Sequence, residues 1–174
     1  MNPIVINIVE RRSIRAYKPD PVPDAALNEI LFAGQWAPSA RGKQTRMMTA
    51  ILNDDLRRRL SDAIQALDGK EPNGGAFYGA PAAILVSDSK ENRFAHFDCA
   101  CVMENLFLAA HALGFGTCWI NQLFERSDEP TIRPLLREAG IPDDYQVCAV
   151  CALGTPAAFT PPKERREGTV QVVR

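Results

Sequence analysis

The chain has 174 residues, of which 46% are hydrophobic and 24% are charged, values that are ordinary for one soluble globular domain. Its 20 Lys and Arg residues nearly balance its 21 Asp and Glu residues, and this net charge of −1 argues against a dedicated nucleic-acid binder. No apolar run approaches the roughly 20 residues that span a bilayer, and the first run lacks the preceding basic region of a secretion signal. We therefore expect a single domain over residues 1–174, located in the cytoplasm.

The first two predicted elements are helices joined by a proline-rich connector. The first is expected over residues 2–12, with Asn2 as its cap and Pro3 at its first helical position. Prolines at three alternate positions make residues 19–23 an extended connector. A second helix follows over residues 24–37, with an apolar face at helical spacing.

Helices and strands alternate in the rest of the chain. In chain order, we expect a polar loop (39–45), a strand (46–52), a helix (54–68), a mobile glycine-rich segment (68–79), a buried strand (80–87), a long helix (96–113), a short strand (114–120), a helix (128–139), a strand (145–152) and a Pro-rich arm with a strand-like tail (155–174). This order predicts an α+β or mixed α/β fold without internal repeats. The tail at 169–173 has no neighbouring strand in sequence, so either it pairs with a distant sheet edge, such as another subunit's, or it is a frayed end.

The five cysteines, an odd number, suggest reduced thiols. Cys148 and Cys151 form a Cys-x-x-Cys motif on a predicted strand, where residues three apart point to opposite faces and cannot share a metal or a disulfide. Cys99 and Cys101 lie in a helical pattern, where residues two apart do not face each other. We therefore expect Cys148 and Cys151 to be core thiols, and we expect no metal site.

The stretch ERRSIRAY, residues 10–17, concentrates positive charge at the end of the first helix. Arg11 and Arg12 are explained by the helix macrodipole, which favours cations at a helix C-terminus. Arg15 lies beyond the helix end, and neither it nor Ser13 is explained in this way. The alternative is that the guanidinium groups and the hydroxyl converge on one phosphate, to which Arg forms bidentate bonds.

Two further polar stretches allow either a solvated surface or a binding role. The loop APSARGKQ, residues 37–44, is dense in donors and acceptors. A nucleophilic role for Ser39 would need a neighbouring base, and neither histidine lies in a matching motif. The run PPKERR, residues 161–166, is a second cationic cluster on a Pro-stiffened arm.

Gly114 and Gly116 resemble half of a dinucleotide-binding fingerprint. Trp119 stands where the third glycine belongs and no helix follows, so we reject a Rossmann interpretation. The two glycines instead predict a turn where backbone can approach another group closely.

Five motifs, in matching order and spacing, resemble the nitroreductase family of FMN-dependent oxidoreductases. They are Arg-Arg-Ser-x-Arg-x-aromatic (11–17), Ala-Pro-Ser with Gln (37–44), Gly-Ala-Pro (79–81), Leu-Gly-x-Gly-x-Cys-Trp-Ile (113–120) and Gly-x-Pro followed by Lys-x-Arg (154–156 and 163–165). The length is that of a minimal member. The resemblance implies a nitroreductase-like fold, with a mixed, mainly antiparallel central sheet flanked by helices. It also implies an obligate homodimer that exchanges the C-terminal strand.

The resemblance also implies which residues bind FMN at the subunit interface. Basic residues and a serine from 11–15 and 163–165 would hold the phosphate and ribityl chain. Arg12 would contribute mainly through its backbone, and Arg15 would lie near the pyrimidine ring. Residues from 38–42 would be donated by the partner subunit, and Gln44 would lie close to the flavin or support that loop. The backbone of 116–119 would lie against the isoalloxazine. The implied set is Arg11, Arg12, Ser13, Arg15, Pro38, Ser39, Ala40, Gly42, Gln44, Gly116, Thr117, Cys118, Trp119, Lys163 and Arg165.

Two positions depart from the family pattern. Gly42 stands where the family usually has Asn, so a flavin hydrogen bond is lost or moves to Arg41 or Lys43, and Arg46 stands where Trp is common. The implied reaction is a ping-pong hydride transfer from NADH or NADPH through flavin N5 to nitroaromatic, quinone or similar acceptors, without a catalytic side chain. Enone reduction, dehalogenation or flavin cleavage on the same fold, and a non-enzymatic flavin-binding or sensing module, are the alternatives.

Overall fold

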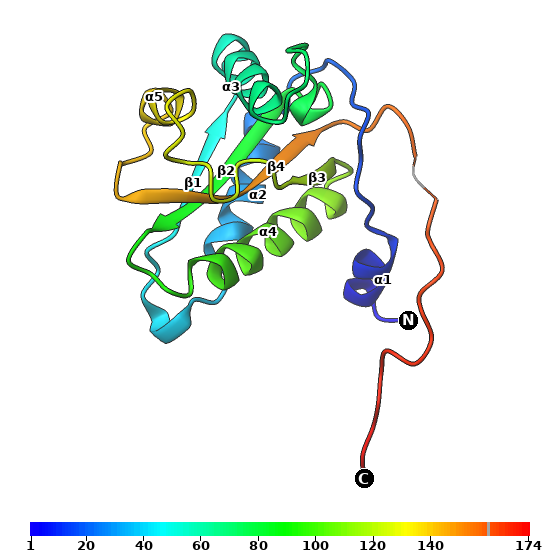
Figure 1. Cartoon of the computed structure of the whole chain (residues 1–174). Coiled ribbons are helices and arrows are strands. Elements are labelled where there is room, and N and C mark those ends of the chain that lie inside the picture. The colour runs from blue at the N-terminus through cyan, green and yellow to red at the C-terminus, as the bar shows by residue number, and fades with distance from the viewer. Residues whose placement is uncertain (160) are drawn as a thin grey trace.

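The structure, a computed structural model that describes residues 1–159 and 161–174, is built around a four-stranded sheet. The strands lie in the order β1-β2-β4-β3, and each neighbouring pair is antiparallel (Figure 1). They are β1 (Met47–Ile51), β2 (Ala82–Ser89), β3 (Gly116–Ile120) and β4 (Tyr145–Gly154). This arrangement confirms the expected α+β fold with a mainly antiparallel central sheet.

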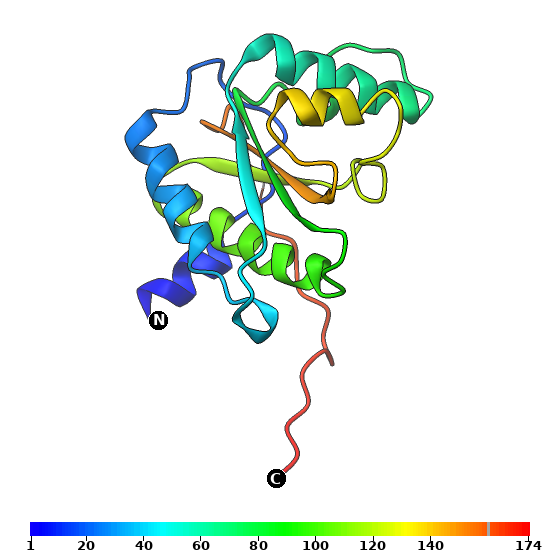
Figure 2. The same ribbon diagram turned by 90° about the vertical axis from the view of Figure 1, so that its left-hand side faces the viewer.

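Helices cover both faces of the sheet, as Figure 2 shows. One face packs against α2 (Asp24–Gln35) and α4 (Ala95–Ala112), and the other packs against α3 (Asp54–Leu67) and α5 (Arg133–Glu138). The remaining helix, α1 (Pro3–Glu10), lies beside α4 and buries none of its residues. Within the described part of the chain, no helix is long and apolar enough to cross a membrane.

The first helix begins where it was predicted to begin and ends two residues earlier than predicted. The Asn2 side chain accepts a hydrogen bond from the Ile4 N–H at 2.9 Å, which caps α1. The helix ends at Glu10 instead of near Arg12, because the backbone of Arg11 is already extended, with φ −55° and ψ 139°. The chain leaves the helix here to run along the sheet.

The predicted helix over 128–139 is wrong in its first half, since α5 begins only at Arg133. Pro134 gives the reason. In a helix that began at residue 128, Pro134 would lie in the interior, where it lacks an N–H and its ring clashes with the carbonyl of Pro130. Proline is tolerated in the first turn of a helix, which is where α5 places it. Gly140, with φ +84°, closes the helix as expected.

Cys148 and Cys151 lie on the same face of β4, which corrects the expectation that they face opposite sides. Both pack in the core cluster between the sheet and α4. The register between β2 and β4 shifts after Val86, so Cys148 is the extra residue of a β-bulge and the alternation of side chains slips by one. Both thiols are free and buried, as predicted. Contact with Cys148 and burial raise the pKa of Cys99 on α4, so this thiol stays protonated.

The glycine-rich segment 68–79 is hydrogen-bonded to α3. The Ser61 hydroxyl accepts from the Ala76 N–H at 2.9 Å, and the Asp62 carboxylate accepts from the Gly74 N–H at 2.8 Å. Phe77 is buried in the core cluster that α3 also supplies. The mobility of this segment stays a prediction, although its second half has core contacts.

The C-terminal arm extends away from the domain (Figure 1). Residues 161–174 form no strand, and Val170, Val172 and Val173 are exposed. The strand-like tail therefore has no pairing partner within the described part of its own chain. Its exchange between subunits stays a prediction.

Candidate cofactor site

The segment that follows α1 is hydrogen-bonded to β3. Ser13 and Thr117 form a parallel β-bridge, and the Ile14 N–H donates to the Thr117 carbonyl at 2.8 Å. Farther along, the Lys18 N–H donates to the Thr155 carbonyl at 2.9 Å. Extended backbone directs alternate side chains to opposite sides, so residues 11, 13 and 15 share one side while Ile14 points into the domain.

Gly116 allows this close approach. A Cβ at this position would lie 2.6 Å from Ile14 Cγ1 and 3.0 Å from Pro156 Cγ. The sequence predicted a turn where backbone approaches another group closely, and that group is a segment of the same chain. Gly116 thus brings the arginine-rich segment directly onto the sheet.

The two cationic runs of the sequence meet at one cavity of about 230 Å³. The residues that line it are Arg11, Arg12, Ser13, Arg15, Pro161, Lys163 and Arg165. Five cationic residues from runs that are far apart in the chain therefore line one space. Such a concentration of positive charge favours an anionic ligand.

Neighbouring side chains hold Arg11 in place but do not use all the hydrogen-bond donors of its guanidinium. Its Nε lies 3.8 Å from Glu104 Oε1, and its guanidinium lies over the Phe107 ring, 5.3 Å from the centroid. The Nε is buried and has no hydrogen-bond partner among the described residues. The separation from Glu104 is longer than a hydrogen bond, so the guanidinium keeps donors for an acceptor such as a phosphate oxygen.

The Arg12 side chain binds the C-terminal end of α1 instead. Its Nη1 donates to the Val9 carbonyl at 2.6 Å and to the Arg11 carbonyl at 2.7 Å. These are carbonyls at the C-terminal end of the helix, so the dipole interpretation is confirmed for Arg12. The expectation that Arg12 contributes to a ligand mainly through its backbone fits this geometry.

Arg15 lies beside an aromatic ring that the sequence did not reveal. Its guanidinium is 5.9 Å from the Tyr78 ring centroid, and the neighbouring Cys118 and Tyr78 raise the pKa of Arg15. Burial raises the pKa of Cys118, while Arg15 and Arg11 act in the opposite direction. Tyr78 belongs to the glycine-rich segment, and no local pattern distinguishes it, because only the fold brings it to Arg15.

Trp119 is the outward-facing residue of β3. Thr117 and Cys118 are buried, whereas Trp119 is 38% exposed. Its indole packs edge-on against Phe107 at 6.3 Å, and its Nε1 donates to Asn121 Oδ1 at 3.2 Å. Trp119 also lines an open cavity of about 410 Å³ whose other residues are Asp68, Tyr78, Asn121, Gln122, Phe124 and Arg126. Tyr78 connects this cavity to Arg15.

Residues 38–44 lie elsewhere in the chain's own fold. The Ala40 N–H donates to Asp98 Oδ1 at 2.9 Å, in the first turn of α4. Glu104, which faces Arg11, comes six residues later, roughly 9 Å farther along the helix axis. None of these loop residues lines the cationic cavity. One chain therefore does not bring Pro38, Ser39, Ala40, Gly42 and Gln44 to the arginine-rich segment, and their donation to a partner stays a prediction.

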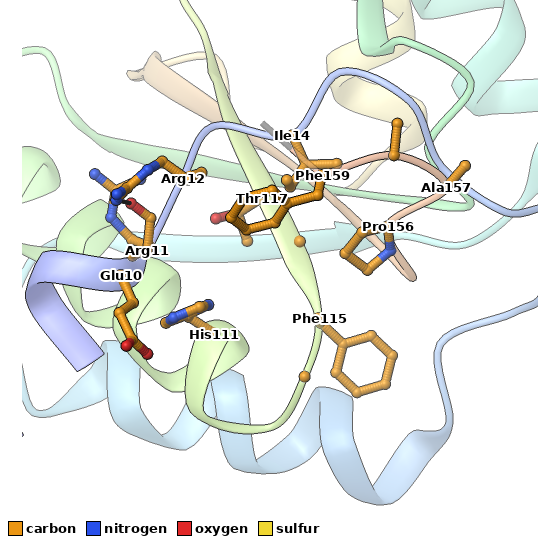
Figure 3. A pocket seen from close by; sticks show the side chains of 13 residues that line it. Glu10, Arg11, Arg12, Ile14, His111, Phe115, Thr117, Pro156, Ala157 and Phe159 are labelled. Atoms are coloured by element: carbon orange, nitrogen blue, oxygen red, sulfur yellow. Dashed lines mark hydrogen bonds between the residues drawn. The ribbon is translucent and has the colours of Figure 1, made fainter. Parts of the chain in front are cut away.

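A second cavity, of about 330 Å³, lies where α1, β3 and the C-terminal arm meet (Figure 3). Arg11 and Arg12 stand at one end, and Phe115 and Pro156 stand at the other. Most of its other lining is apolar or glycine. It lacks Lys163 and Arg165, so the cavity of about 230 Å³ is the stronger candidate for binding a phosphate.

Comparisons with known proteins point to one family. The model of the nitroreductase family matches residues 8–155. The chain is 30% identical over 153 residues to an Archaeoglobus fulgidus protein provisionally named NADH dehydrogenase/NAD(P)H nitroreductase, which covers 86% of this chain and 83% of that protein.

Two solved structures extend the similarity to the whole fold. A Bacteroides fragilis nitroreductase with bound FMN has 35% identity and a TM-score of 0.92, covering 100% of both chains. An FMN-dependent nitroreductase from Clostridium difficile has 28% identity and a TM-score of 0.81, covering 97% of this chain and 99% of that one. The chain therefore belongs to the nitroreductase family.

Proposed function

We propose that the protein is an FMN-dependent oxidoreductase that takes hydride from NADH or NADPH and passes the electrons to nitroaromatic, quinone or similar acceptors. The observation that carries this proposal is the cavity at which Arg11, Ser13 and Arg15 meet Lys163 and Arg165. Relatives whose names include FMN and NAD(P)H support it.

The phosphate of FMN fits the cationic cavity. A phosphate monoester carries close to two negative charges at neutral pH and has three strong acceptor oxygens. Arg11 lines the cavity with a guanidinium that Glu104 does not saturate, and Arg165 and Lys163 add charge from the arm. The Ser13 hydroxyl supplies a neutral hydrogen-bonding group on the same side of the segment.

The remaining residues would set the environment of the flavin ring. Bound FMN supplies hydride acceptance and donation, which no protein side chain can provide. Arg15 keeps a permanent positive charge beside Tyr78 and Cys118, where it would stabilise negative charge on a neighbouring ligand. The open cavity at Trp119 and Asn121 would give a donor or acceptor access from solvent.

A homodimer completes the proposal, and exposed apolar side chains support it. Ile4, Ile8 and Val9 on α1, Trp36 after α2 and Phe97 on α4 are each at least 47% exposed. Large apolar groups concentrated on neighbouring helices are typical of a protein interface. We therefore propose that a second copy covers this face and brings residues 38–44 to the cofactor.

The open edge of the sheet indicates where an exchanged tail would pair. The outer edge of β3 is occupied by Ser13, which bridges to Thr117. The opposite edge strand, β1, pairs only with β2 among the described strands. We propose that residues 169–173 of one subunit add a strand to β1 of the other.

The test is the visible spectrum of the purified full-length chain, before and after titration with FMN. We expect a yellow protein that NADH or NADPH bleaches in the absence of oxygen and that a quinone or nitroaromatic compound restores. If the protein is colourless and acquires no FMN on titration, the oxidoreductase proposal is refuted. A yellow protein that neither nicotinamide cofactor bleaches would indicate a flavin-binding module or a different electron donor.

A further inference from the structure

The loop at residues 38–44 has an unfavourable backbone. Arg41 and Gln44 have positive φ values of 57° and 52°, and Gly42 between them has φ 63°. Left-handed conformations are uncommon for residues other than glycine, and they persist where the surrounding structure holds them. The loop is solvent-exposed from residue 41 to residue 44, so contacts of its own side chains with the core do not account for its shape.

Both ends of the loop are anchored. Before it, the carbonyls of Gln35 and Ala37 accept from Arg46 Nη2, the former at 3.2 Å. After it, the carbonyl of Thr45 accepts from the Tyr145 hydroxyl at 2.8 Å. Arg46 stands where tryptophan is common in the family pattern, and its side chain caps the C-terminal end of α2. Between these ends, the Gln44 N–H donates to Ser39 Oγ at 3.1 Å and the Gly42 N–H donates to the Ser39 carbonyl at 3.0 Å, so Ser39 closes the strained turn. Ala40, next to Ser39, has a separate support from the domain.

Asp98 supplies that support. Its Oδ1 accepts from the Ala40 N–H at 2.9 Å, and its Oδ2 accepts from Asn92 Nδ2 at 3.2 Å. The same Asn92 nitrogen donates to Asp88 at 2.8 Å and approaches Thr45 Oγ1 at 3.4 Å. Asp88, Asn92 and Asp98 are all buried, at 0%, 6% and 5% exposure. Buried carboxylates hold their partners firmly, because an unpaired charge or donor there is costly.

We propose that Asp98 is a positioning residue for the reaction. Through the Ala40 N–H, it fixes the strained loop in the shape that presents the exposed residues Arg41 and Lys43 away from their own subunit, toward the FMN of the partner. Asp98 itself touches no cofactor. The inference rests on the proposed FMN-binding dimer, since residues 38–44 lie outside the cationic cavity of their own chain.

The hydrogen bond can be broken from either side. Asp98→Ala removes the acceptor, and Ala40→Pro removes the donor while leaving Asp98 in place. The backbone of Ser39, with φ −135° and ψ 148°, is already suitable for a residue that precedes proline. The matched control is Asn53→Ala, because the Asn53 side chain also accepts from a backbone N–H, that of Leu56, at 2.9 Å.

The experiment titrates FMN into each full-length variant and records the visible circular dichroism of the bound flavin. We expect both D98A and A40P to weaken FMN binding about tenfold and to change the dichroism. The D98A/A40P double variant should be no weaker than either single variant, because the two substitutions remove the same bond. N53A should lower thermal stability without changing either flavin signal.

The outcomes separate this inference from the proposed function. If the unmodified protein binds no FMN, the proposed function fails first. If the unmodified protein binds FMN and A40P binds it equally well with the same dichroism, the positioning role is overturned. If D98A does not fold, A40P decides the question alone, because it leaves the buried carboxylate cluster intact.

Discussion

Gly116→Ala tests whether the arginine-rich segment must lie directly on β3. The added Cβ would lie 2.6 Å from Ile14 Cγ1, 2.9 Å from Ile14 Cβ and 3.0 Å from Pro156 Cγ. Ile14 Cβ is attached to the backbone, so the segment itself must move. Overpacking of this kind costs about 1–3 kcal/mol. Loss of the hydrogen bond from Ile14 to the Thr117 carbonyl would add about 1 kcal/mol.

Two measurements follow from that displacement. The combined loss is about 2–4 kcal/mol, so in a chain of this size the melting temperature should fall by about 4–16 °C at fixed protein concentration. FMN affinity should fall about tenfold or more, because Arg11 and Ser13 are carried by the displaced segment. Thermal denaturation and FMN fluorescence titration of the full-length chain measure the two effects.

Gly34→Ala is the matched control. Its Cβ would meet Met48 Sδ at 2.5 Å and Leu106 Cδ2 at 2.9 Å, which are the outer atoms of flexible side chains that can shift. We expect this variant to retain the FMN affinity of the unmodified protein. If G116A binds FMN as tightly as G34A does, the close approach of the segment to β3 is not what holds the phosphate site together.

Three further substitutions or deletions test other parts of the structure. Arg11→Ala should weaken FMN binding by about 1.5–3 kcal/mol, tenfold or more, and unchanged affinity in a titration would exclude Arg11 from the phosphate site. Deletion of residues 169–174 should shift a dimer toward monomer in sedimentation, whereas an unchanged dimer would argue against strand exchange. The hydrogen bond from Lys90, followed by that from Arg133, lowers the pKa of Asp128, so its carboxylate stabilises the fold above its ordinary pKa and loses this effect as the pH falls through the lowered value. Because Asp128 is exposed, Asp128→Asn should lower the free energy of unfolding in urea by less than about 1 kcal/mol at neutral pH, and this cost should shrink as the pH falls below the ordinary pKa of aspartate. A cost that does not shrink in acid would contradict the assignment.

Short-range signals were sufficient to place most elements and both cationic runs. Asn2 and Pro3 predicted the start of α1, because capping and proline geometry act within one helical turn. Short apolar runs, rich in small and β-branched residues and bounded by turn residues, predicted the strands of the sheet. The resemblance then related residues 11–17 to residues 163–165, which the structure places at one cavity.

The errors have long-range causes, with the exception of α5, where the local effect of Pro134 was overlooked. Cys148 faces the same side as Cys151 because the pairing of β4 with β2 contains a bulge, which neither strand encodes alone. The early end of α1 reflects the bridge between Ser13 and Thr117.

The residues of the candidate site also divide into those that the sequence singled out and those that only the fold revealed. Residue type and spacing singled out Arg11, Ser13 and Arg15 as candidates for an anion site, since guanidinium groups bind phosphate through charge-assisted hydrogen bonds. Only the tertiary structure added Glu104, Phe107 and Tyr78 as the neighbours of these arginines. The hydrogen bond from the Ala40 N–H to the Asp98 carboxylate likewise becomes visible only in the fold. The physical reason is that capping and periodicity depend on residues within a few positions of each other, whereas these contacts join side chains that the chain brings together only when it packs.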